Sequence, residues 1–154
     1  MRAKTCCFTG HRSINTADYD NIKQRLHHII EKLIADGVIY YGCGGALGFD
    51  TMAAETILEL REVYTSIKLI MVCPCLEQDK FWSARNKEKY REILQRADKV
   101  VYVSKEYTED CMLKRNRHLV DNSKYCICYL KKPTGGTAYT VTYAKENGLT
   151  IIPV

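Results

Sequence analysis

Short apolar runs recur along this chain, and most of their positions are apolar in succession rather than in alternation. They are rich in Val, Ile, Tyr and Cys, which is typical of strands buried on both faces of a parallel sheet. The pattern predicts strands over residues 4–9, 38–41, 67–73, 99–103, 125–130 and 150–153.

Between these runs the apolar residues follow the period of a helix. In residues 18–36 they form one stripe, and Gly37 supplies a stop at the carboxyl end: Ile22, Leu26, Ile29, Ile30, Leu33 and Ile34. Further helices are predicted over 51–64, 85–97, 109–122 and 137–147. Alternation of strand and helix indicates one α/β domain over residues 1–154, Rossmann-like, with a six-stranded, mostly parallel sheet and helices on both faces.

Composition narrows the setting of this domain. No run approaches the roughly 18 apolar residues of a membrane span, and the first residues enter a strand at once, so we expect a cytoplasmic protein without a membrane partner. The eight cysteines include no CxxC pair, which favours buried, reduced thiols, no metal and no cofactor. Cys43 stands apart because it lies in a glycine-rich loop, where a reactive thiol is the alternative interpretation.

The unusual residues collect in three loops that follow strands. They read TGHRS after the first strand, GCGGALGFD after the second and KKPTGGTAYT after the fifth. Ligands of such sheets bind beyond the carboxyl ends of the strands, and a helix that begins with glycine suits a phosphate. The predicted ligand-binding residues are Thr9, Gly10, His11, Arg12, Gly44, Gly45, Gly48, Gly135, Gly136 and Thr137.

Two further features of the sequence allow alternative interpretations. Asp50 either caps the following helix or accepts hydrogen bonds from ribose hydroxyls. Phe81 and Trp82 either stack on a base or pack a helix on the sheet. The first loop is not GxGxxG, and the chain has neither a P-loop nor a GxSxG elbow, so a common dehydrogenase, a P-loop NTPase and an α/β-hydrolase are not expected.

Four segments in order resemble the YpsA-like family of the SLOG superfamily, over nearly the whole chain. They read CCFTGHR, GGALGFDTMAAE, YTEDCMLKRNRHLVDNS and GGTAYTVTYAKENGLTIIPV. That superfamily joins the Smf/DprA DNA-processing proteins to the LOG phosphoribohydrolases. The resemblance implies a Rossmann-like fold that binds a nucleotide-derived ligand at the glycine loops, and the RNRHLVDNS segment also looks like its counterpart in DprA, whose fold binds single-stranded DNA.

The sequence departs from the LOG enzymes at one important place. Those enzymes pair an arginine with a glutamate in a PGGxGTxxE-type motif, whereas here Thr134 follows Pro133 and no carboxylate follows Thr137 until Glu146. Cleavage of a glycosidic bond needs a nearby carboxylate. Asp50 and Glu55 are the candidates from another loop, so the catalytic candidates are Asp50 and Arg115.

Basic residues concentrate in the segment 114–132, which carries six Lys or Arg against Asp121 alone. The segment is either a solvated face or a rim that attracts an anion. Successive helical residues differ by about 100°, so Arg115 and Arg117 point about 200° apart, and we favour Arg115 for the site. The expected function is binding or sensing of a phosphorylated nucleoside, an ADP-ribose-like molecule or a cyclic nucleotide. The alternatives are an N-glycosidic hydrolase of nucleoside monophosphates and a DprA-like binder of single-stranded DNA; a homo-oligomer is also considered.

Overall fold

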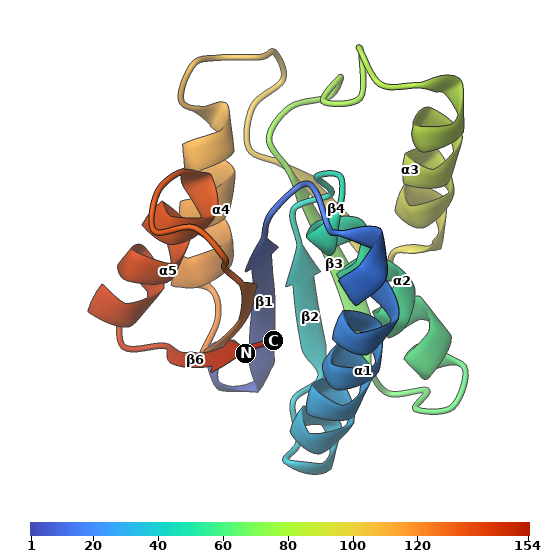
Figure 1. The fold of residues 1–154 in the computed structure, drawn as a ribbon, viewed down its shortest axis with the longest axis vertical. Helices are drawn as coiled ribbons and strands as arrows, with labels where there is room; N and C mark the ends of the chain where they lie inside the picture. The colour runs from blue at the N-terminus through green and yellow to red at the C-terminus, as the bar shows by residue number, and fades with distance from the viewer.

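The computed structural model describes residues 1–154, which form one six-stranded sheet (Figure 1). All neighbouring strands pair in parallel, in the order β4-β3-β2-β1-β5-β6. The strands are β1 Thr5–Gly10, β2 Tyr40–Cys43, β3 Lys68–Cys73, β4 Lys99–Tyr102, β5 Tyr125–Tyr129 and β6 Thr150–Pro153. The expected Rossmann-like α/β class is therefore confirmed, with a sheet that is parallel throughout.

Five α-helices connect the strands and cover the sheet. They are α1 Tyr19–Ala35, α2 Phe49–Arg61, α3 Ala84–Arg96, α4 Cys111–Asp121 and α5 Gly136–Glu146, with short 3-10 helices at Arg2–Lys4 and Thr16–Asp18. Helices α1, α2 and α3 lie on one side of the strands in Figure 1, and α4 and α5 lie on the other. No helix has the length and apolar character needed to cross a membrane.

Helix beginnings differ most from the sequence expectation. Helix α2 begins two residues earlier than predicted, because Gly48 takes the N-cap position with a φ of 78°. Helix α4 begins two residues later, because Thr108 donates a hydrogen bond from its hydroxyl to the Asp110 carboxylate at 2.8 Å and Asp110 becomes the N-cap. Local turns at the strand-to-helix connections therefore set where these helices begin.

The hydrophobic core is much larger on the α1–α3 side. A cluster of 24 buried residues joins that side to the sheet, whereas 7 buried residues pack beneath α4 and α5. All eight cysteines are free and buried, as expected. Cys43 belongs to the larger cluster, and burial raises the pKa of its thiol well above the ordinary value, so the interpretation of Cys43 as a reactive thiol is wrong.

The strand order reverses beside β1. The chain moves from β1 through β2 and β3 to β4 in one direction, and then crosses to place β5 on the other side of β1. Strands β1 and β5 pair up to their carboxyl ends, where Gly10 lies opposite Tyr129. A crevice at such a reversal is where open parallel sheets bind ligands.

Candidate functional site

A cavity of about 330 Å³ lies at the carboxyl ends of β1 and β5. It combines residues from the first loop, the start of α2, the first turns of α4 and the loop before α5. The lining residues are Phe8, Thr9, Gly10, His11, Arg12, Ala46, Asp50, Met112, Arg115, Asn116, Lys132, Thr134, Gly135, Gly136 and Thr137. The structure thus brings together nine of the predicted site residues: Thr9, Gly10, His11, Arg12, Asp50, Arg115, Gly135, Gly136 and Thr137.

His11 joins the first loop to the third. Its Nε2 accepts hydrogen bonds from the backbone N–H groups of Lys131 and Lys132, at 2.7 and 3.4 Å. Burial and the nearby Lys132 ammonium lower the pKa of His11, which favours the neutral ring that can accept these bonds. His11 therefore joins the loops after β1 and β5 through an uncharged imidazole.

The third loop presents an open helix N-terminus to the cavity. Gly135 is the N-cap of α5 with a φ of 96°, which favours glycine, and no side chain caps the helix. A Cβ added at Gly135 or Gly136 would meet no atom within 4 Å. The first N–H groups of a helix have no partner within it, so those of α5 are free to bind an anion.

The glycines of the second loop are packed against protein, and only Ala46 and Asp50 of this loop line the cavity. A Cβ at Gly44 would lie 2.5 Å from Nη1 of Arg115, and one at Gly45 would lie 2.9 Å from Gln78 and Tyr90. A Cβ at Gly48 would lie 2.2 Å from the carbonyl oxygen of Arg12. The expectation that these three glycines line the pocket is thus corrected. Their lack of a side chain lets other protein groups pack closely against the loop.

The donors of the second loop are also used inside the chain. The N–H of Phe49 donates to the carbonyl of His11 at 3.1 Å, and the N–H of Ala46 donates to Oδ2 of Asp50 at 3.2 Å. Since Gly48 is the N-cap of α2, the interpretation of Asp50 as that cap is wrong. The carboxylate of Asp50 braces the loop instead, and it lines the cavity.

Asp50 and Arg115 are the two buried charges of the site, at 7% and 4% exposure. Burial raises the pKa of the Asp50 carboxyl, while Arg115, the Ala46 N–H and Arg12 oppose that rise. Nη1 of Arg115 donates to the carbonyl of Gly44 at 2.5 Å, and Nε donates to Oδ1 of Asn116 at 2.7 Å. Arg115 therefore supplies a fixed positive charge beside the cavity.

Arg117 lies elsewhere, on the exposed face shared by α4 and α5. Its Nε donates to the Tyr139 hydroxyl at 3.0 Å, and its guanidinium lies 5.6 Å from the centre of the Tyr143 ring.

The lysines of the basic segment 114–132 do not all lie at the same end of the sheet. Lys124 lies before β5, at the amino end of the sheet, whereas Lys132 lines the cavity beyond the carboxyl end.

Several lining residues were not predicted from the sequence: Phe8, Ala46, Met112, Asn116, Lys132 and Thr134. Met112 could have been found, because it lies three residues before Arg115 and shares its helix face. Asn116 is fixed by its hydrogen bond with Arg115, a contact that no sequence spacing indicates. No group of three or more His, Cys, Asp or Glu side chains is arranged to hold a metal ion.

Comparison with known proteins places the chain in a family. The YpsA family model, described as the YspA SLOG family, matches residues 6–150. The chain belongs to the YpsA family of SLOG proteins. Among its relatives, a UPF0398 protein of Bacillus cereus (strain G9842) is 29% identical over 94% of this chain and 84% of that protein. The uncharacterized SPbeta prophage-derived protein YoqJ of Bacillus subtilis (strain 168) is 32% identical over 83% of this chain and 82% of that protein.

Two solved structures share the fold of this YpsA-family chain. DNA processing protein A (DprA) from Streptococcus pneumoniae superposes with a TM-score of 0.70 at 18% identity. DprA from Helicobacter pylori, described for its mode of binding single-stranded DNA, gives a TM-score of 0.69 at 22% identity. The alignments cover 98% and 97% of this chain but only 50% and 64% of the DprA chains, and at such identities they show the fold alone.

Proposed function

We propose that this protein binds or senses a phosphorylated nucleoside, or a ligand derived from one, at the carboxyl edge of its sheet. The observation that carries the proposal is the uncapped N-terminus of α5, where Gly135 and Gly136 leave the helix dipole open to the cavity. Such a terminus carries about half a positive charge and free N–H donors. A phosphate group is the ligand chemistry that fits it.

The remaining charges of the cavity support an anionic ligand with hydroxyl groups. Arg12, Arg115 and Lys132 line the cavity together with a single carboxylate, Asp50. Asp50 is the acceptor that ribose hydroxyls would require, as acids are in other nucleotide sites. A volume of about 330 Å³ lies at the lower end of the range of small-molecule pockets, which suits a ribose phosphate.

Hydrolysis of the N-glycosidic bond is the second candidate, because Asp50 and Arg115 lie in one cavity. However, Asp50 is the only carboxylate that lines it, and glycoside hydrolysis generally uses a pair. Glu55 lies apart, in an ion pair with Lys89 at 3.4 Å. Binding is therefore favoured over turnover, and chromatographic detection of free adenine from AMP would reverse that order.

Binding of single-stranded DNA is the third candidate, motivated by the DprA likeness and the basic segment. Lys124 and Lys132 are separated by the length of β5, which is about 17 Å at the usual rise per residue. The segment thus does not form one rim around the cavity. A small anionic ligand needs only the charges already at the cavity, and is favoured for that reason.

The Gly136→Asp variant tests the proposal, with Gly136→Ala as the matched control. Both side chains enter open space, so both variants should fold. The aspartate sets a negative charge where the phosphate is expected, so the affinity for AMP should fall at least ~100-fold. The alanine variant should bind within a few-fold of the parent. Calorimetric titration with AMP measures both, and equal affinity of the two variants would contradict a phosphate at α5.

A further inference from the structure

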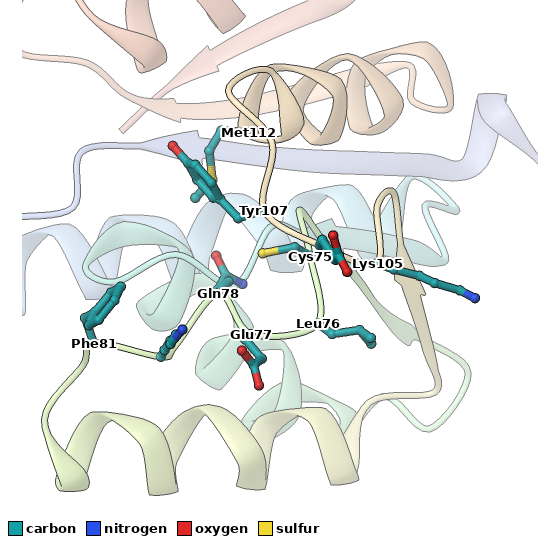
Figure 2. Close-up of a pocket in the computed structure, with 10 residues that line it drawn as sticks. Cys75, Leu76, Glu77, Gln78, Phe81, Lys105, Tyr107 and Met112 are labelled. Carbon is teal, nitrogen blue, oxygen red and sulfur yellow. The ribbon is translucent and has the colours of Figure 1, made fainter.

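A second, larger cavity of about 840 Å³ lies at the ends of β3 and β4. Figure 2 shows its walls, which come from the loop between β3 and α3, the loop between β4 and α4, and the start of α4. Its large aromatic and apolar members are Leu76, Phe81, Tyr107 and Met112. Its polar and charged members are Glu77, Gln78, Lys80, Lys105 and Glu106. The proposed phosphate site does not account for this cavity.

The two cavities share a wall. Met112 lines both of them. The carbonyl of Gly44 accepts one hydrogen bond from Nε2 of Gln78, in the second cavity, at 3.2 Å, and another from Nη1 of Arg115, in the first, at 2.5 Å. The two cavities therefore adjoin at Met112 and at the peptide group of Gly44.

Two aromatic rings of the second cavity have no packing role. Phe81 is 91% exposed and Tyr107 is 69% exposed. Trp82, the neighbour of Phe81, packs edge-on against Tyr90, with 5.2 Å between the ring centres. The packing interpretation from the sequence therefore applies to Trp82, and Phe81 is left as the candidate for stacking on a base. In Figure 2, Tyr107 and Met112 lie above the loop that carries Gln78 and Phe81. Exposed aromatic rings that line a cavity are a surface on which nucleobases can stack.

We propose that the second cavity is the base subsite of the ligand, with the nucleobase stacked on Phe81 or Tyr107 and the phosphate at α5. This inference rests on the proposed function and adds where the base lies. Lys80 and Lys105 line the same cavity together with Glu77 and Glu106, and Nζ of Lys80 lies 5.5 Å from the centre of the Phe81 ring. The two lysines and two glutamates balance in charge, so this cavity suits the uncharged base, whereas the excess of positive charge lies in the first cavity beside α5.

The test crosses two ligands with two variants. The double variant Phe81→Ala with Tyr107→Ala is compared with Tyr19→Ala, which removes a partly exposed ring at the start of α1 that lines neither cavity. AMP and ribose 5-phosphate are titrated calorimetrically into each. Stacking contributes roughly 1–3 kcal/mol per base, so the double variant should bind AMP at least ~5-fold more weakly, while its affinity for ribose 5-phosphate stays unchanged. Tyr19→Ala should bind both ligands as the parent does.

Each other result contradicts the inference in a distinguishable way. Unchanged AMP affinity in the double variant would remove the base subsite but leave the phosphate site in place. Equal weakening towards both ligands would show that the rings support the fold instead. If the parent binds neither ligand, the proposed function fails together with this inference. If it binds oligothymidylate through these rings but not AMP, the cavity serves single-stranded nucleic acid and not a small nucleotide.

Discussion

The Gly48→Ala variant is expected to lose about 3 kcal/mol or more of folding free energy. Two causes act at this position. The φ of Gly48 is 78°, a conformation that strains any residue with a side chain, and the added Cβ would lie 2.2 Å from the backbone carbonyl oxygen of Arg12. The backbone of Arg12 cannot rotate away as a flexible side chain could, so the loop after β1 and the start of α2 would have to move apart.

Gly148→Ala is the matched control for this prediction. Gly148 has the same φ of 78°, but a Cβ there would meet no atom within 4 Å. Backbone strain alone should therefore cost Gly148→Ala about 1 kcal/mol. Chemical denaturation of both variants measures the difference. Similar losses in the two would show that the contact between Gly48 and the first loop does not constrain the fold.

The Arg115→Met variant is expected to lose both stability and ligand affinity. Methionine replaces the unbranched apolar stem of the side chain but leaves Asp50 buried without its main counter-charge. The loss of folding free energy should be about 2 kcal/mol or more at neutral pH. Loss of a charged donor should weaken AMP binding at least ~10-fold. Arg117→Met, which removes an exposed arginine of the same helix, should leave AMP affinity unchanged.

The pH dependence of unfolding should identify Asp50 as the cause of the instability expected for Arg115→Met. Burial raises the pKa of Asp50 in the folded chain above its value in the unfolded chain. The folded state therefore binds more protons above the ordinary aspartate pKa, so this group lowers stability as pH rises through that window. Without Arg115 the folded pKa rises further, and Arg115→Met should lose more stability than the parent between pH 5 and pH 8. Adding Asp50→Asn should remove that excess loss, as denaturation at both pH values would show. An Arg115→Met profile parallel to the parent's would rule out electrostatic coupling between Asp50 and Arg115.

The sequence by itself determined the fold class and the edge of the sheet at which the loops of the candidate site meet. Buried apolar runs alternating with helical stripes require a parallel sheet, and all strands of such a sheet end at one edge. The loop after β1, which includes Thr9, and the loop after β5, which includes Thr137, consequently had to meet, although they are far apart in the chain. These conclusions follow from periodicity, which is a property of the chain alone.

Only the tertiary structure decided which of the predicted residues face the cavity. Gly44 and Gly136 both occur in glycine-rich loops, yet Gly44 lies behind Arg115 and Gly136 opens to solvent. Phe81 and Trp82 are adjacent, yet one is exposed and the other packs on Tyr90. The local sequence determines that a turn contains small residues and backbone N–H groups without a partner in the turn. Whether another segment accepts hydrogen bonds from those N–H groups depends on contacts between loops that are distant in sequence. Such contacts form only once the strands have paired.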